Sequence, residues 1–244
     1  MNLYTSRQTK TLDRLAIKEQ RLSAFSLMEE AANFSFNALL SYWPDTKQVF
    51  TFCGKGNNAG DGYLVANLAN EVGLESFVIQ ISKQGNLSRP SSKALKISRS
   101  SGVKFITLKS FTKMSLNKAV LVDALLGTGV KGNVRKNISD VIKVINQKSI
   151  HYPVLSIDIP SGICADTGEE LGTAIKANLT TTFIGRKRGC YTSSGRSNSG
   201  TIEFSDLGIK KTITNKVISN CYILDMEKSL AKILNRPKDS HKGD

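Results

Sequence analysis

Three stretches of this 244-residue chain place glycine, amide and carboxylate side chains directly after apolar runs. They are "GKGNNAGDG" at 54–62, "DALLGTGVKGN" at 123–133 and "DIPSG" at 158–162. In open parallel α/β sheets, ligands bind beyond the carboxyl ends of the strands. Turn formation alone could explain any one of these loops, but three of them along one sheet edge predict a shared ligand site.

The first loop carries a weak dinucleotide-binding signature. Its residues 54–59 satisfy the pattern G-x-G-x-x-A. A dehydrogenase would also have an acidic residue about 20 positions later, at the end of the next strand, where this chain has "QISKQ". A nucleotide-triphosphate loop would continue as Gly-Lys-Ser or Gly-Lys-Thr, which is missing. What remains is a set of backbone N–H groups at a helix N-terminus, suited to a phosphate or another anion. The side chains of Asn57, Asn58 and Asp61 add contacts that a plain phosphate loop does not require.

Proton transfer in this chain is expected to fall to carboxylates or lysines, because histidines are scarce. Only His151 and His241 are present. The four cysteines lie far apart in the sequence and lack the spacing of a zinc site or a disulfide framework, so we expect free thiols; they are Cys53, Cys164, Cys190 and Cys221.

The elements that must position these loops alternate between strands and helices. Apolar runs at 48–53, 76–82, 104–108, 119–126 and 154–159 predict strands buried on both faces of a parallel sheet. Helical patterns cover 7–42, 63–72, 91–101 and 136–148, and further strands near the sheet edge are expected at 180–184 and 201–204. This alternation predicts the α/β class, as a three-layer Rossmann-like domain with a mostly parallel central sheet.

Composition is that of an ordinary soluble protein, apart from its charge. The chain has 34 basic and 20 acidic residues, a net charge of +14. The basic residues are dispersed, apart from "GRKRG" at 185–189 and the tail, and no RNA-binding motif with interleaved aromatic residues is present. A nucleic-acid partner is therefore not favoured. The alternatives are a basic proteome and a field that attracts anionic small molecules. No apolar run is long enough to cross a membrane and no signal peptide is visible, so we expect a cytoplasmic protein without a membrane partner.

Four motifs in order make a more specific case. "GKGNNAGDGYLVA", "VDALLGTGVKG", "LSIDIPSGICADTG" and "TTTFIGRKRG" resemble the YjeF N-terminal-domain family, the NAD(P)HX epimerases. The opening "YTSRQTKTLDRLAIKEQRLSAFSLMEEAA" is similar to that family's N-terminal helices, so the likeness covers nearly the whole chain. One departure is Ala59, where the family usually has glycine; its methyl group is tolerable unless the position needs a positive φ.

The resemblance implies a reaction and its partners. Members interconvert the R and S forms of NADHX and NADPHX, the hydrated by-products of reduced nicotinamide cofactors, as a step of metabolite repair. A dehydratase that uses ATP or ADP, fused or separate, then acts on the S form. Members are often dimeric, which leads us to expect a homodimer. The rival hypothesis is a non-catalytic scaffold or RNA-associated module of the same family, which would be expected to lose the site residues that this chain keeps.

The resemblance also assigns residues. The substrate would lie against Asp158 and two loops, composed of Asn57, Asn58, Ala59, Gly60, Asp61, Gly127, Thr128, Gly129, Val130, Lys131, Gly132 and Asn133. The family's potassium ion would be held by Asn58, Asp123 and Ser161, which offer oxygen donors only.

The implied chemistry suits a carboxylate. The reacting carbon carries a hydroxyl and adjoins the ring nitrogen, so protonation lets water leave and water returning to the other face inverts the centre. Asp158 could give and take that proton, the alternative being a turn residue before Pro160. Lys187 could meet the substrate's phosphates or tune Asp158, the alternative being a solvated lysine in a basic loop.

The sequence predicts one domain over 1–230 and a polar tail over 231–244. The tail includes "NRPKDSHKGD" and resembles the linker that opens the dehydratase domain of two-domain relatives, the alternative being a disordered terminus.

Overall fold

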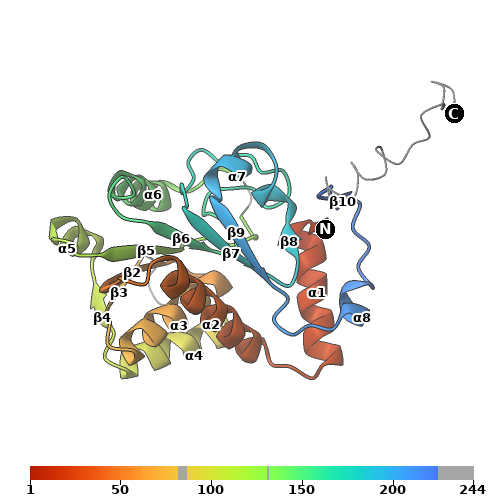
Figure 1. Cartoon of the computed structure of the whole chain (residues 1–244), viewed down its shortest axis with the longest axis horizontal. Helices are drawn as coiled ribbons and strands as arrows, with labels where there is room; N and C mark the ends of the chain where they lie inside the picture. Colours follow the sequence, from red (N-terminus) through yellow and green to blue (C-terminus); the bar gives the residue numbers. More distant parts are fainter. Residues whose placement is uncertain (82–86, 131, 225–244) are drawn as a thin grey trace, which may run out of the picture.

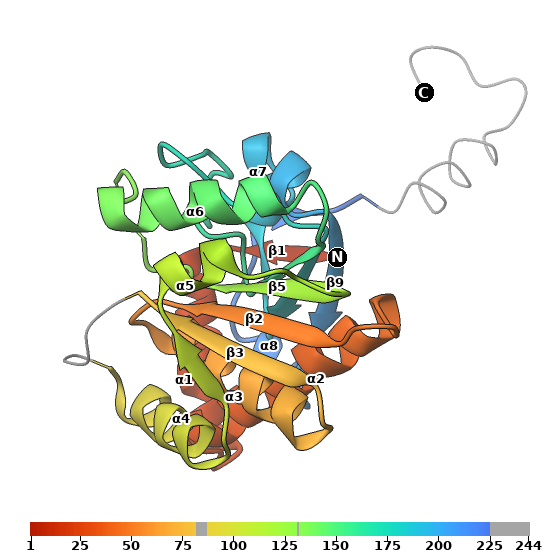
Figure 2. The ribbon, with the colours of Figure 1, turned by 90° about the vertical axis from the view of Figure 1, so that its left-hand side faces the viewer.

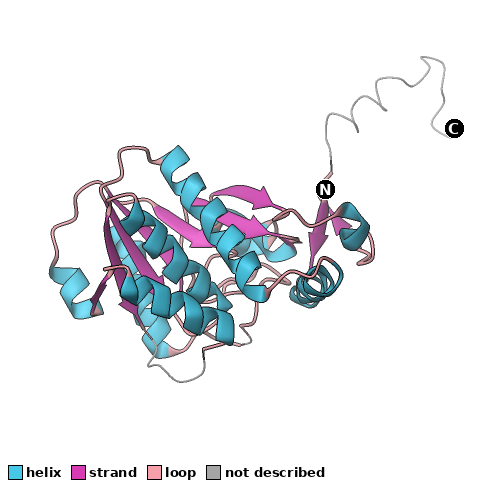
Figure 3. Ribbon diagram, turned by 90° about the horizontal axis from the view of Figure 1, so that it is seen from below, coloured by secondary structure: helices cyan, strands magenta, loops and turns pink. Residues whose placement is uncertain are grey.

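The computed structural model describes residues 1–81, 87–130 and 132–224 as a layered α/β structure (Figure 1). One long sheet lies between two groups of helices, which Figure 3 shows from below. The helices are α1 Ser6–Glu19, α2 Ala24–Tyr42, α3 Asn57–Glu71, α4 Arg89–Ser100, α5 Leu108–Lys113, α6 Lys136–Lys148, α7 Ser193–Asn198, α8 Lys211–Thr214 and the 3₁₀ turn η1 Arg188–Cys190. The predicted Rossmann-like architecture is confirmed.

The central sheet is fully parallel, with strand order β4-β3-β2-β5-β6-β7-β9. From β2 the chain moves outward through β3 and β4, then returns to β5 on the other side of β2. That reversal creates a crevice at the carboxyl ends of β2 and β5, where such folds bind ligands. The strands are β2 Gln48–Cys53, β3 Glu75–Gln80, β4 Lys104–Ile106, β5 Ala119–Ala124, β6 Val154–Ile157, β7 Leu179–Phe183 and β9 Thr201–Ser205.

Both faces of the sheet are buried, which explains the continuous apolar runs. In β2, Val49 and Cys53 face a core cluster shared with α1, α2, α3 and α4. The intervening Phe50 and Phe52 face a second cluster, shared with α5 and α6. Figure 2 shows α5 and α6 on one side of the sheet and α2, α3 and α4 on the other.

A small second sheet fastens the N-terminus to the main body. Its order is β10-β1-β8, composed of Cys221–Tyr222, Asn2–Tyr4 and Arg186–Lys187. Tyr4 is the register partner of Lys187, so the chain start and α1 lie beside the edge at which β7 ends. Figure 1 shows α1 next to β8.

Two helix predictions need correction. The expected helix over 7–42 is two helices, because the chain breaks at Gln20 and restarts at Ser23, whose hydroxyl accepts the backbone N–H of Ser26 as an N-cap. The helix expected from residue 63 begins at Asn57, since Gly56 forms its N-cap. Much of the predicted ligand loop is therefore the first two turns of α3.

The other predicted strands and helices agree with the structure within a few residues at each end. All four cysteines are free thiols. Among the described residues, no helix combines the length and apolar character needed to span a membrane. The predicted tail over 231–244 lies outside the described residues, as does the last part of the predicted domain after Leu224.

Candidate active site

A cavity of about 510 Å³ opens at the carboxyl ends of β2 and β5. It gathers residues from all three predicted loops, which lie far apart in the sequence. The predicted site residues that line it are Asn57, Asn58, Asp61, Gly127, Thr128, Gly129, Val130, Asp158 and Lys187. The expectation that the three loops meet along one rim is confirmed.

The glycines of the first loop have different tasks. A Cβ at Gly54 would lie 1.9 Å from the carbonyl oxygen of Leu125, so only glycine lets β2 end against the neighbouring chain. A Cβ at Gly56 would meet nothing within 4 Å. Gly56 therefore leaves open space where the backbone enters α3. This is the N-terminal end of the helix, which carries the positive end of the helix dipole.

A buried polar network underlies the cavity. The carboxylate of Asp123 accepts hydrogen bonds from the Ser161 hydroxyl at 2.6 Å and the Ser161 N–H at 2.8 Å. It also accepts the Ser156 hydroxyl at 2.9 Å and the Leu125 N–H at 3.2 Å. Burial raises the pKa of Asp123, and these bonds oppose the rise.

Asn58 joins this network through one of its two polar atoms. Its side-chain N–H donates to the Leu126 carbonyl at 2.8 Å, and that carbonyl also accepts the Ser161 hydroxyl at 3.2 Å. Its Oδ1 is buried and has no hydrogen-bond partner within the described part of the chain. An unpaired buried acceptor is costly, so this oxygen is available for a ligand.

Asp158 sits on strained backbone at the end of β6. Its φ is +71°, a conformation that side chains other than glycine rarely adopt. The N–H of Ile159 donates to the carbonyl of Ile157 at 2.9 Å, which closes a three-residue turn around Asp158. The N–H of Asp158 itself donates to Thr181 of β7 at 2.6 Å. Such strain concentrates at functional sites.

Lys187 forms an ion pair with the carboxylate of Asp158. The lysine side chain is 5% exposed and the aspartate side chain 19% exposed. The ammonium also donates to the Phe183 carbonyl at 2.9 Å. Burial rules out the alternative of a solvated lysine, and the pair places one fixed cation next to one partly exposed carboxylate.

Sequence reasoning missed a third carboxyl group in the cavity, Asp13 of α1. Burial raises its pKa to about 6, against the opposing effect of Lys187. Burial, followed by the nearby Asp158, raises the pKa of Asp61 well above its ordinary value. The cavity therefore holds three carboxyl groups around one buried ammonium, an arrangement that favours partial protonation.

Some predicted residues lie away from the cavity. Ala59 is buried in α3 without a positive φ, so its methyl group is accommodated. Gly60 packs against Met28 of α2 rather than a ligand space. Gly132 and Asn133 are exposed and do not line the cavity, and Lys131 lies outside the described residues.

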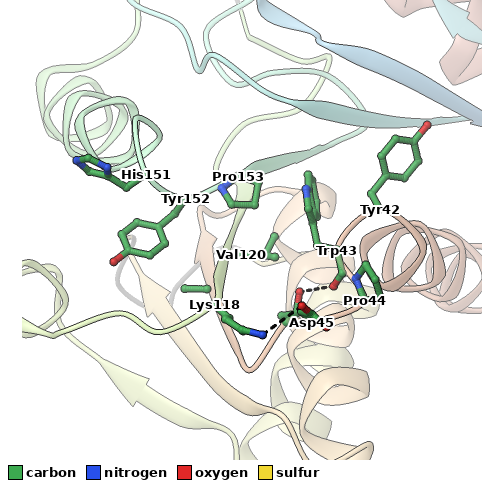
Figure 4. Close-up of a pocket in the computed structure, with 11 residues that line it drawn as sticks. Tyr42, Trp43, Pro44, Asp45, Lys118, Val120, His151, Tyr152 and Pro153 are labelled. Carbon is green, nitrogen blue, oxygen red and sulfur yellow. Dashed lines mark hydrogen bonds and ion pairs between the residues drawn. The ribbon is translucent and has the colours of Figure 1, made fainter.

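A second cavity, of about 400 Å³, lies at the opposite ends of the strands, next to the residues that precede β2, β5 and β6 (Figure 4). Its walls include Trp43, Tyr152 and Pro153, and Lys118 pairs with Asp45 at 3.1 Å. None of the predicted site residues lines it. Of these two cavities, the one at the carboxyl ends of the strands holds the predicted site residues.

Comparison with known proteins gives consistent matches. Residues 24–189 match the family described as YjeF-related protein N-terminus. The bifunctional NAD(P)H-hydrate repair enzyme Nnr of Coxiella burnetii is 38% identical over 242 residues, which cover 99% of this chain and 48% of that protein. The NAD(P)H-hydrate epimerase of Legionella pneumophila strain Philadelphia 1 is 29% identical, over 99% of this chain and 91% of that protein.

A solved structure supports the fold. The crystal structure of the yeast protein YNL200c aligns with a TM-score of 0.77 at 18% identity, covering 91% of this chain and 96% of that chain. The chain spans about half the length of the bifunctional relatives it matches.

Proposed function

Since the chain belongs to the family of YjeF-related protein N-termini, we propose that it is an NAD(P)H-hydrate epimerase. It would interconvert the R and S forms of NADHX and NADPHX as an isomerase of metabolite repair. The single observation that carries this proposal is the ion pair of Asp158 and Lys187, held on strained backbone in the cavity at the strand-order reversal. The printed names of the relatives agree with it.

The reaction needs a proton donor and a stabiliser of positive charge. When the hydroxyl next to the ring nitrogen leaves as water, positive charge spreads onto that nitrogen. In its protonated form, Asp158 can donate a proton to the departing oxygen. In its ionised form, the same side chain can stabilise the cation. Lys187 fixes the position of Asp158, because their ion pair and the Phe183 carbonyl leave the ammonium little freedom.

The dinucleotide's diphosphate would lie at the start of α3. Backbone N–H groups of the first turn and the helix dipole attract anions there. Lys10 and Lys55 also line the cavity and add two basic side chains. The loop of Gly127–Val130 borders the same space, so the adenosine and nicotinamide halves can extend along the edge of the sheet.

A potassium ion is proposed at Asn58, Asp123 and Ser161. The residues fit such an ion, because the Oδ1 of Asn58 is buried without a partner and Asp123 supplies a buried negative charge. Within the described residues, no three His, Cys, Asp or Glu side chains form a metal cluster, so neutral oxygens would complete the ligand set. When bound, the ion would offset the charge of the carboxylates beside it.

The partners follow from the substrate. We propose that a dehydratase using ATP or ADP, fused or separate, consumes the S form. A homodimer and a cytoplasmic location, where reduced nicotinamide cofactors are available, complete the proposal. A nucleic-acid partner is not favoured, because the chain's basic residues are dispersed along its sequence.

The test starts from one pure epimer of NADHX, followed by chiral chromatography. We expect the wild-type protein with potassium to equilibrate the epimers faster than buffer, and Asp158→Asn to lose about 10²–10⁴-fold of that rate. The Kd for NADH should change by less than about twofold. A larger change would mean that the substitution weakens binding rather than proton transfer. A folded wild-type protein without acceleration would refute the proposed function.

A further inference from the structure

The carboxyl group of Asp13 lies in the cavity without a structural task. Asp13 stands in the middle of α1, so it caps neither end of the helix. Its carboxylate accepts no hydrogen bond and forms no ion pair with any described residue. Asp166 provides a contrast, because it accepts the Ser6 N–H at 2.6 Å and the Ser6 hydroxyl at 3.1 Å to fasten the start of α1.

The helix that carries Asp13 is held firmly over the cavity. A capping box at Thr5 and the bonds to Asp166 fix its start, and Glu19 at its end pairs with Lys216 at 2.8 Å. Its inner face is pressed against Gly185, where a Cβ would lie 3.0 Å from Tyr4 and 3.1 Å from both Leu12 and Thr9. The contact of α1 with the turn at Gly185 therefore fixes where Asp13 lies relative to Lys187.

Asp13 and Asp158 share a cavity but have unlike surroundings. Asp158 is paired directly with Lys187. Asp13 has no such partner among the described residues, and the charged groups that face it are Lys187, Asp158, Lys10 and Asp61. Burial and its acidic neighbours favour the protonated form of Asp13, whose pKa is raised to about 6. Two carboxyls whose environments differ in this way are suited to opposite roles in proton transfer.

We propose that Asp13 is the second proton-transfer group of the reaction, acting together with Asp158 on the two oxygens exchanged at the reacting carbon. The inference rests on the proposed epimerase function. The geometry carries it, because inversion needs one proton given to the departing oxygen and one taken from the entering water. Two carboxyl groups, Asp13 of α1 and Asp158 at the end of β6, line the same cavity, where this can occur.

The step balances in atoms and charge. The carboxylic acid of Asp13 gives its proton to the hydroxyl, the carbon–oxygen bond breaks, and water leaves. The ring nitrogen's electron pair stabilises the resulting cation. A second water forms a new carbon–oxygen bond on the opposite face while Asp158 accepts its proton. The reverse reaction, or exchange with solvent, returns the proton from Asp158 to Asp13.

Asp13→Asn tests this role, with Asp140→Asn as the matched control. Asp140 is an exposed aspartate of another helix, α6. We expect Asp13→Asn to lower kcat by about 10²-fold or more, while the KD for NADH changes less than about twofold. In the wild type, kcat/KM should fall as pH rises above about 6, because the acid form of Asp13 becomes scarce. That limb should vanish in Asp13→Asn and return in Asp13→Glu.

Three outcomes separate the possibilities. If the wild type accelerates epimerisation and Asp13→Asn keeps its rate within about threefold and its pH profile, the inference is overturned while the function stands. If the loss lies in KD rather than kcat, Asp13 is a binding residue and the inference is also wrong. If the folded wild type does not accelerate epimerisation, the proposed function fails and the inference with it.

Discussion

At the scale of single residues, Asp158 combines a strained backbone conformation with an ion pair to Lys187. A residue other than glycine with φ near +71° costs about 1–3 kcal/mol and persists only where its surroundings force the conformation. Here a hydrogen bond to Thr181 and the lysine supply that force. The result is a carboxylate held in the wall of the cavity. In an unstrained turn, the same side chain would be free to rotate toward solvent.

Lys187→Met should therefore destabilise the protein as well as slow it. Removing one partner of a buried ion pair costs about 3–5 kcal/mol, and we expect the lower end because Asp158 is partly exposed. Urea unfolding measures this change. Lys216→Met is the matched control, since its pair with Glu19 is largely exposed and such pairs contribute about 0–1 kcal/mol.

A double mutant makes the comparison stricter. With Asp158→Asn present, the additional effect of Lys187→Met on the free energy of unfolding should shrink, because no carboxylate is left without its cation. Equal effects of Lys187→Met in both backgrounds would show that the lysine packs without interacting with Asp158.

At the scale of elements, the start of α3 separates two uses of glycine. Gly54 is required by the fold, because a Cβ there would collide with the Leu125 carbonyl at 1.9 Å. Gly56 has open space around the position of a Cβ, on the side where the ligand is proposed to lie. One short segment thus shapes both the sheet edge and the binding surface.

These two positions give opposite expectations for the same substitution. Gly54→Ala should lower the melting temperature strongly, since the colliding atom belongs to the backbone of β5's end and cannot move away easily. Gly56→Ala should keep the wild-type melting temperature but weaken NADH binding, because a methyl group would hold the diphosphate away from the N–H groups. Calorimetry for both variants decides it; wild-type binding by folded Gly56→Ala would contradict the proposed ligand position.

The sequence predicted the elements well and the N-terminal part of the site poorly. Apolar runs and glycine-rich strand ends sufficed for the parallel sheet and for placing Asp158 and Asn58 at one edge. Asp13 was missed because it lies in an amphipathic helix within the opening stretch, whose likeness to the family assigned no role to any single residue. Its role depends on contacts with a turn about 170 residues later, which no local pattern encodes. Likewise, "NNAGDG" was assigned to a loop because glycine and asparagine disfavour helices, yet packing against α2 and β5 makes it helical.

At the scale of the whole molecule, the cavity depends on both ends of the described chain. The small sheet joins Leu3 to Cys221 and Tyr4 to Lys187, so α1 closes over an edge built by β2, β5 and β6. Asn58, Asp123 and Ser161 underlie the same edge from three separate segments. An ion bound among them would link these segments and stabilise the fold as a unit.

Potassium should therefore raise the melting temperature relative to tetramethylammonium at equal ionic strength. A ligand at 100 times its Kd adds about 2.7 kcal/mol, and each kcal/mol shifts Tm by roughly 2–4 °C for a chain of this size. Asn58→Ala should abolish the difference, and the exposed Asn137→Ala should keep it. An equal Tm in both salts for the wild type would refute the proposed ion site.

The most direct test of the central claim follows the oxygen atom. One pure epimer of NADHX is incubated with the wild-type protein in H₂¹⁸O. The opposite epimer is then isolated, and its ¹⁸O content is measured by mass spectrometry. Because the hydroxyl leaves as water and solvent returns to the other face, we expect each inverted molecule formed by the enzyme to carry ¹⁸O, with formation nearly lost in Asp158→Asn. Rapid inversion that retains the original oxygen would contradict the account, and so would inversion that Asp158→Asn leaves unchanged.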